Sequence, residues 1–134
     1  MKTTVESTLQ GTSIVPSLTA NDLQRSIRFY EGLGFGIDER WEDKGVLMGE
    51  MLRAGKSYIG LSQDDWKQGR DRVKGVGMRI TIATAQNVDE LAASAKSAGI
   101  NLQSEPHDTP WGRAFEATDP DGFKVTIYTE ESES

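Results

Sequence analysis

Trp111, in the run Pro110-Trp111-Gly112, is the side chain best suited to hold a small molecule. An indole can stack on a flat ligand or lie against a cationic one, because the face of its ring carries partial negative charge. The alternative is a tryptophan that packs against another module, and the sequence leaves both roles open. Trp41 and Trp66 lie in charged surroundings, where packing or an interface is the simpler interpretation.

His107 is the only histidine and therefore a candidate general base. It lies in the segment Glu105-Pro106-His107-Asp108-Thr109-Pro110, which we expect to be a loop. Glu105 or Asp108 could orient its ring for proton transfer. The simpler interpretation is a surface histidine. A metal site made from His107, Asp108 and Glu50 has no support from their spacing.

Composition excludes several chemistries. The 134 residues contain no cysteine, so disulfides, thiolate metal sites and cysteine nucleophiles are excluded. Phosphate-binding glycine loops, dinucleotide-binding glycine motifs and serine-nucleophile motifs do not occur in the sequence. A formal net charge of −6 without a basic stripe argues against nucleic acid as a partner. Without a long apolar run or a signal-peptide pattern, we expect no membrane partner and a cytoplasmic location.

Hydrophobic periodicity predicts the elements of the first half. A strand is expected at Ile14–Thr19, followed by a helix that begins after the N-cap candidates Asn21 and Asp22 and ends at Gly34. The apolar residues of this helix share one face: Leu23, Ile27, Tyr30 and Leu33. Three extended segments follow, at about Phe35–Trp41, Val46–Arg53 and Ser57–Ser62.

The same order begins again after a charged connector, residues 63–76. Met78, Ile80 and Ile82 alternate with polar residues, which predicts a strand whose apolar side chains face a helix. Asn87 and Glu90 form a capping-box pattern at the start of that helix, and Gly99 ends it. The last three strands are expected at Leu102–Ser104, Arg113–Ala117 and Phe123–Tyr128.

The two halves form an internal repeat. A spacing of 65 residues aligns Leu23 with Val88 and Gly34 with Gly99. We therefore expect an α+β fold of two βαβββ modules, residues 13–62 and 77–129, that pair within one chain or between two around a concave half-barrel. Residues 1–12 are expected to be a flexible or partner-wrapping arm, and residues 130–134 an acidic tail. An unrelated α+β sandwich is the alternative.

Two motifs carry a more specific resemblance. The first is the segment Asn21-Asp22-Leu23-Gln24-Arg25-Ser26-Ile27-Arg28-Phe29-Tyr30-Glu31-Gly32-Leu33-Gly34-Phe35, and the second is the hairpin 110–128, in which Asp119-Pro120-Asp121-Gly122 forms the turn. Together they resemble the opening signature and last hairpin of the vicinal-oxygen-chelate superfamily, which contains glyoxalase I, the bleomycin-resistance proteins and the extradiol dioxygenases. The resemblance covers residues 13–129. It implies a concave sheet around a ligand cavity, usually in a homodimer.

The resemblance also implies four positions for metal ligands, which metal-dependent members fill from His, Glu and Gln. Matching strands between the modules places these positions at Val15, Gly60, Arg79 and Thr126. Valine and glycine side chains offer no donor atom, threonine is a weak neutral ligand, and a guanidinium repels cations. We therefore expect neither a metal nor another cofactor.

Strand alternation directs a polar and aromatic set of side chains toward the concave face. Such side chains orient a small ligand through a few hydrogen bonds. Arg79, with Lys124 near it, would favour an anionic group. In bleomycin-resistance-like members, the resemblance places a Trp-Gly pair at the cavity mouth. The expected ligand-binding residues are Thr19, Tyr58, Arg79, Trp111, Thr126 and Tyr128.

Three functional hypotheses follow. The first is a metal-free dimer that sequesters or carries an aromatic or drug-like compound in a Trp/Tyr-lined cleft. The second is an enzyme of the same fold, a lyase, isomerase or dioxygenase-type catalyst that uses metal at other positions or acid–base residues such as His107 or Tyr58. The third is a regulatory or assembly module whose cleft only completes a dimer interface.

Overall fold

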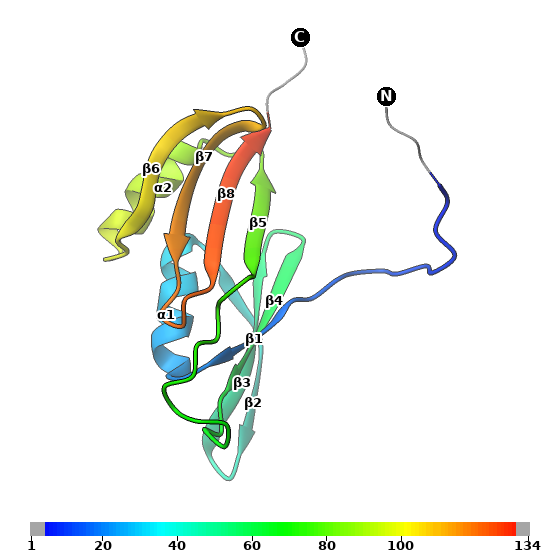
Figure 1. Cartoon of the computed structure of the whole chain (residues 1–134), viewed down its shortest axis with the longest axis vertical. Helices are drawn as coiled ribbons and strands as arrows, with labels where there is room; N and C mark the ends of the chain where they lie inside the picture. The colour runs from blue at the N-terminus through cyan, green and yellow to red at the C-terminus, as the bar shows by residue number, and fades with distance from the viewer. Residues whose placement is uncertain (1–4, 131–134) are drawn as a thin grey trace.

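Two four-stranded sheets, each with one helix against it, make up the computed structural model, which describes residues 5–130 (Figure 1). Sheet A has the strand order β1-β4-β3-β2 and sheet B the order β5-β8-β7-β6. In each sheet the first and last strands of the module pair in parallel, and the other pairs are antiparallel. The elements are β1 (Ser17–Ala20), α1 (Leu23–Leu33), β2 (Gly36–Asp43), β3 (Val46–Ala54), β4 (Ser57–Gln63), β5 (Arg79–Thr84), α2 (Val88–Ser97), β6 (Leu102–Thr109), β7 (Gly112–Thr118) and β8 (Lys124–Glu130).

The element order confirms two βαβββ modules in an α+β fold, and both sheets are open rather than closed into a barrel. Within residues 5–130, neither helix has the length and apolar character needed to cross a bilayer. The acidic tail beyond residue 130 and the first four residues of the predicted arm lie outside the described residues. Residues 5–12 form neither helix nor strand and lead away from the sheets (Figure 1).

Helix α1 begins and ends at the residues that its sequence predicts. The Asp22 side chain accepts a hydrogen bond from the Arg25 backbone N–H at 3.3 Å, which satisfies one of the free donors of the first turn. Gly34 has φ = 109°, a left-handed conformation that glycine adopts without steric cost. Ile27 and Tyr30 are buried on the face that covers sheet A.

Helix α2 repeats this design with smaller side chains. The Asn87 side chain accepts a hydrogen bond from the Glu90 backbone N–H at 3.1 Å. Between the described residues, no reciprocal bond from the Glu90 carboxylate completes the predicted capping box. Ala92 and Ala95 are buried, so the helix lies close to its sheet. Gly99, with φ = 92°, follows the end of the helix.

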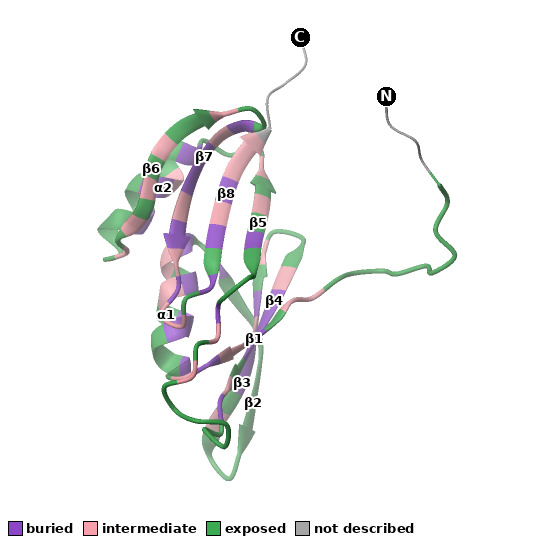
Figure 2. Ribbon diagram, viewed as in Figure 1, coloured by how far each residue is buried: buried purple, intermediate pink, exposed green. Residues whose placement is uncertain are grey.

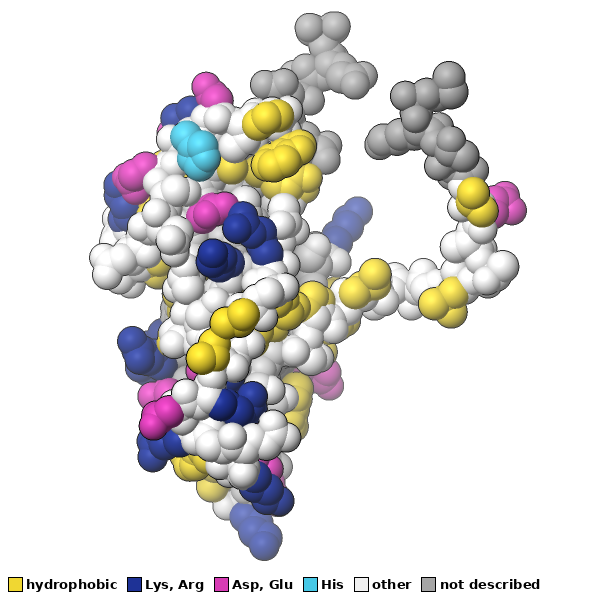
Figure 3. Space-filling model, in the orientation of Figure 1, with side chains coloured by type: hydrophobic (Ala, Val, Ile, Leu, Met, Phe, Trp, Pro, Cys, Tyr) yellow, Lys and Arg dark blue, Asp and Glu magenta, His cyan; other side chains and the backbone are white. Residues whose placement is uncertain are grey.

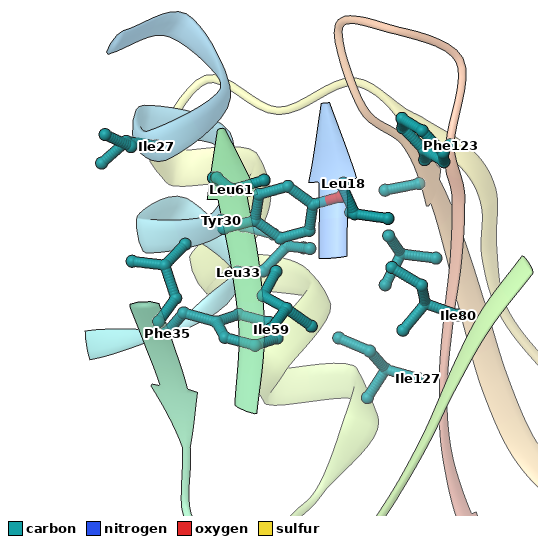
Figure 4. Close-up of a cluster of buried hydrophobic side chains, with 14 of the residues drawn as sticks. Leu18, Ile27, Tyr30, Leu33, Phe35, Ile59, Leu61, Ile80, Phe123 and Ile127 are labelled. Carbon is teal, nitrogen blue, oxygen red and sulfur yellow. The ribbon is translucent and has the colours of Figure 1, made fainter. Parts of the chain in front are cut away.

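One apolar core is shared by the two modules (Figure 2). Its largest buried side chain is Tyr30, whose ring packs edge-on against Phe29 and Phe35 with centroids 5.0 and 5.5 Å apart. In Figure 4 the Tyr30 ring lies beside Leu18 and its oxygen points away from α1. The core also includes residues of β5 and β8, so the second module packs against the first through apolar contact.

The turn between β7 and β8 has the chemistry expected of Asp-Pro-Asp-Gly. The Asp119 carboxylate accepts hydrogen bonds from the backbone N–H groups of Asp121 and Phe123, both at 2.9 Å. Gly122 has φ = 92°, and its N–H donates to the Asp119 carbonyl at 3.0 Å. The predicted hairpin is confirmed, because these bonds close the turn and set the register of β7 against β8.

The same turn fastens the second module to α1. Tyr30 Oη donates to Asp119 Oδ2 at 2.8 Å, in a buried setting. Asp121 accepts from the Asn21 N–H at 3.1 Å and from Ser26 Oγ at 3.2 Å. Burial raises the pKa of Tyr30, and the Asp119 carboxylate raises it further, so the hydroxyl keeps its proton and acts as the donor.

The connector between the modules is held by ion pairs. Asp64 lies 3.1 Å from Arg72 Nη2 and 3.5 Å from Lys74 Nζ. Burial opposes ionisation of Asp64, but the Arg72 hydrogen bond and the two positive charges outweigh it and hold its pKa below the usual range. Gly75 lies against the β7–β8 turn, where a Cβ would come within 2.1 Å of the Gly122 carbonyl carbon. The connector is therefore anchored to the fold at Asp64 and Gly75, while residues 65–71 between them are exposed.

The prediction that Glu105–Pro110 is a loop was wrong. Strand β6 extends from Leu102 to Thr109, and His107 pairs with Ala114 of β7. The segment was missed because proline usually excludes a strand. Here Pro106 lies on an edge strand, within the register shift between Ser104 and His107, where its missing N–H breaks no inner ladder bond.

Two smaller boundaries also differ from expectation. Strand β1 begins at Ser17 instead of Ile14, because the chain before Pro16 leaves the edge of the sheet and Ile14 is exposed. Met78 was expected to face a helix, but it precedes β5 and is exposed. Gly77, with φ = 80°, turns the chain before the strand begins.

Candidate functional site

A pocket of about 420 Å³ lies on the helix-free face of sheet B. Helix α2 covers the other face, so the strands alone form the floor (Figure 1). Figure 3 shows this side of the molecule, where basic, acidic, histidine and apolar side chains lie close together. The lining comes from all four strands and the β6–β7 turn: Arg79, Thr81, His107, Thr109, Trp111, Ala114, Glu116, Thr126 and Tyr128. This volume suits a small organic ligand.

Alternation along β5 and β8 explains which side chains face the pocket. Ile80, Val125 and Ile127 are buried on the helix side. Their neighbours in the strand therefore point to the other face, and Arg79 and Thr126 line the pocket as predicted. Tyr128 and Trp111 were also expected near the ligand, and they lie in the same pocket, together with Thr81.

The floor of the pocket carries an ion pair. Arg79 Nη1 lies 2.6 Å from Glu116 Oε1. Thr126 joins both partners, because its Oγ1 accepts from Arg79 Nη1 and donates to Glu116 Oε1, each at 3.3 Å. The pair is partly exposed, with the Arg79 side chain 47% and the Glu116 side chain 26% accessible.

Sequence reasoning missed Glu116. Arg113–Ala117 was expected as a strand without an assignment of its two faces, because Ala114 and Phe115 are both apolar and obscure the alternation. Counting back from the Asp119–Gly122 turn would have found it, since the hairpin register pairs Glu116 with Thr126. The position of the turn therefore predicts that Glu116 lies on the same face of the sheet as Thr126.

Trp111 lies at the rim of the pocket, in the turn between β6 and β7. Its backbone N–H donates to Thr109 Oγ1 at 3.2 Å, and that hydroxyl donates to the Gly112 carbonyl at 2.6 Å. These bonds hold the turn, while Trp111 itself is 74% exposed. An indole in this position has a free face for a ligand or for a partner surface.

His107 also lines the pocket, but without either predicted orienting carboxylate. Its Nδ1 lies 2.8 Å from the Glu105 carbonyl oxygen, a contact that requires the proton on Nδ1. The Asp108 carboxylate pairs instead with Arg113 at 3.1 Å, and that of Glu105 pairs with Lys96. The imidazole is therefore oriented by backbone, and its Nε2 is left as an acceptor.

The remaining predicted ligand contacts lie elsewhere in the chain. Tyr58 lines a separate hollow between the modules together with Ile14, Phe35 and Ile80. Thr19, in β1, pairs with Ser62 in sheet A and does not line the sheet B pocket. Within one chain, the structure therefore brings together four of the six predicted contacts.

The residues at the family's metal positions do not fit a divalent ion. Val15 precedes β1, and Gly60 lies in β4 with no side chain to donate. Arg79 is already paired with Glu116, and Thr126 uses its hydroxyl in that pair. Among residues 5–130, no group of three His, Cys, Asp or Glu side chains is placed to hold a metal.

Comparison with known proteins agrees with this architecture. The family model described as the Glyoxalase/Bleomycin resistance protein/Dioxygenase superfamily matches residues 12–127. No sequence among the curated proteins matches the chain.

Three solved structures illustrate the likeness. TioX from Micromonospora sp. ML1 is 20% identical with a TM-score of 0.71, and the match covers 90% of this chain and 100% of TioX. TnmS3, an antibiotic binding protein from Streptomyces sp. CB03234, is 20% identical with a TM-score of 0.69, covering 94% and 100%. A bleomycin-binding protein complexed with bleomycin is 22% identical with a TM-score of 0.65, covering 90% and 100%. At these identities the likeness establishes the fold and leaves the ligand open.

Proposed function

Because the chain belongs to the glyoxalase/bleomycin resistance protein/dioxygenase superfamily, we propose that its sheet B pocket binds an aromatic, drug-like small molecule. The protein sequesters or carries this ligand by stoichiometric binding, without turnover. The observation that carries the proposal is the exposed indole of Trp111 at the rim of a pocket with polar groups on its floor. Two neighbours of the same fold, TnmS3 and the bleomycin-binding protein, are described as binding antibiotics, which supports this class of ligand.

The binding is metal-free in this proposal. Its support is the chemistry of the side chains: a guanidinium and a threonine hydroxyl stand where a metal-dependent member needs donors, and both are engaged with Glu116. Elemental analysis of protein purified without chelator should find less than about one-tenth of a metal ion per chain. One stoichiometric divalent ion would contradict the assignment and favour an enzyme of the same fold.

The proposal includes a homodimer, in which a second copy covers the open side of the pocket. Every residue of β2 is exposed in the single chain (Figure 2). Apolar side chains on this hairpin, including Trp41 and Val46, are accessible as well. Such a surface is typical of an interface between chains.

Calorimetric titration with a panel of aromatic antibiotics tests the binding function. We expect at least one compound to bind with a stoichiometry of about one per chain and to be recovered chemically unchanged. Trp111→Ala should weaken this binding about tenfold, because it removes the stacking surface. The matched control is Trp66→Phe, which changes an indole in the connector outside the pocket.

The outcomes separate the hypotheses. Equal binding by Trp111→Ala and the parent would remove the pocket rim from the proposal. A ligand that is chemically altered during incubation would favour an enzyme, with His107 as the first residue to test. Failure of every compound to bind, together with a stable dimer, would favour the assembly role.

A further inference from the structure

From the floor of the pocket we infer that the site selects a neutral, planar ligand group with a hydrogen-bond acceptor and a donor side by side, of which a primary aromatic carboxamide is the simplest example. The inference rests on the proposed function and specifies the ligand class. It differs from the sequence-based expectation of an anionic ligand, because Glu116 lies beside Arg79.

The charges that line the pocket favour neither an anionic nor a cationic ligand. The pocket lining contains four charged or titratable side chains: Arg79, Glu116, His107 and Tyr128. Arg79 and Glu116 lie 2.6 Å apart, so a ligand carboxylate near Arg79 also meets the negative charge of Glu116. A ligand cation near Glu116 is attracted by that carboxylate and repelled by the Arg79 guanidinium. At comparable distances the two Coulomb energies nearly cancel, and neither sign of ligand charge is favoured.

The Arg79–Glu116 pair has unused hydrogen-bonding capacity. Arg79 makes both of its contacts through Nη1, and Glu116 receives both of its contacts on Oε1. In the described part of the chain, no hydrogen bond uses Arg79 Nε or Nη2, or Glu116 Oε2. The pair therefore offers N–H donors next to a carboxylate acceptor.

The position of Thr126 makes this arrangement persistent. Its hydroxyl accepts from Arg79 and donates its single proton to Glu116, so it links the two side chains. Thr126 itself lies in β8, between β5 and β7, the strands that carry the pair. The donor and acceptor are thus presented from three adjacent strands, which is a more rigid base than a loop.

The complementary ligand group follows directly. A carboxamide accepts from Arg79 through its oxygen and donates to Glu116 through its N–H₂ group. A carboxylate has no donor for Glu116, and an amidinium has no acceptor for Arg79. The aromatic ring that carries the amide then extends toward the rim, where Trp111 and His107 provide flat surfaces for stacking.

Four probes with the same ring system test the inference by calorimetry: the isosteric naphthamide, naphthoate and naphthamidine, and unsubstituted naphthalene. We expect naphthamide to bind about tenfold more tightly than each of the others, because only it satisfies both members of the pair. Tighter binding of naphthoate or naphthamidine would overturn the inference. Equal binding of all four would overturn it and leave the proposed function standing, whereas no binding by any probe would overturn both.

A second experiment measures the same four probes against the variant Glu116→Gln. This substitution keeps the size of the side chain and removes its charge, so the uncompensated Arg79 should bind naphthoate about tenfold more tightly than the parent does. The matched control is Glu105→Gln, which removes a carboxylate from β6 that pairs with Lys96 outside the pocket lining. An unchanged order of the four probes in Glu116→Gln would show that the pair does not set the ligand charge.

Discussion

Glu50 is completely buried, but its carboxylate lacks hydrogen bonds. In the described chain neither of its carboxylate oxygens has a hydrogen-bond partner, and the nearest cation is Arg40, with Nε 3.6 Å from Oε2. Burial raises the pKa of Glu50; the Arg40 charge opposes the rise, and the Glu31 charge adds to it. Because the folded-state pKa exceeds the unfolded one, the ionised carboxylate disfavours folding. This penalty is absent below the unfolded pKa and grows as the pH rises through the folded pKa.

Glu50→Gln should therefore stabilise the protein at neutral and alkaline pH. We expect the free energy of unfolding to rise by about 1 kcal/mol at pH 8, since the variant avoids burying a charge that lacks hydrogen bonds. Near pH 4 the gain should disappear, because Glu50 is then protonated in the parent. Urea denaturation at both pH values measures the difference. Glu39→Gln, at an exposed position on the same hairpin, is the control, and an equal gain at both pH values would contradict the argument.

At the residue level, strand alternation was enough to assign side chains to one face of sheet B where the pattern was clear. Arg79, Thr126 and Tyr128 lie on strands whose other face carries large branched residues, so period-two patterning assigns them to the pocket. Glu116 was missed because its strand places apolar side chains on both faces. Thr19 and Tyr58 do not line this pocket, because strand alternation assigns a side chain to a face and does not place the two sheets relative to each other.

Among the elements, α1 depends on a polar contact for its attachment to the second module. Tyr30 is buried and donates to Asp119, a residue of the β7–β8 turn. Burial raises the pKa of Asp119, while hydrogen bonds from Phe123, Tyr30 and Asp121 lower it, and the balance is a raised value. Each donor thus offsets part of the rise in the Asp119 pKa that burial causes.

Tyr30→Phe should lower the free energy of unfolding by about 1–3 kcal/mol, the range for losing a hydrogen bond to a buried charged group. The ring and its aromatic contacts are kept, so the loss reports on the hydroxyl. The control is Tyr58→Phe, because the Tyr58 hydroxyl makes no hydrogen bond with any described residue. Thermal and urea denaturation measure both variants. Equal stability of the two would mean that the contact to Asp119 contributes nothing.

Element boundaries were predicted well where capping residues are present and poorly where they are absent. Asp22, Gly34 and Asn87 place the helix ends because their side chains or backbone angles satisfy specific terminal groups. Strand β6 has no such signal. It is an edge strand with two register shifts and a proline, and it is recognised only through its pairing with β7.

At the scale of the whole molecule, the internal repeat predicted the architecture but not the surface it leaves open. The two modules share one apolar core on the helix side, and their sheets are not joined by strand pairing. Within residues 5–130, both helix-free faces therefore lack a covering helix or strand. Sequence periodicity cannot specify what covers them, because the contacting residues belong to a second surface.

The β2–β3 hairpin is the surface that we expect to form the interface of a dimer. Trp41 is 42% exposed and Val46 is 59% exposed, and β2 has no buried residue on either face. Sedimentation equilibrium should show a dimer at micromolar concentration. Trp41→Glu should weaken the dimer at least about tenfold by placing a charge among apolar contacts.

Val73→Glu, at an exposed apolar position of the connector, is the control. A monomeric parent at tens of micromolar would remove this hairpin as an interface and leave each sheet B pocket open to solvent, so that ligand affinity would depend on one chain alone.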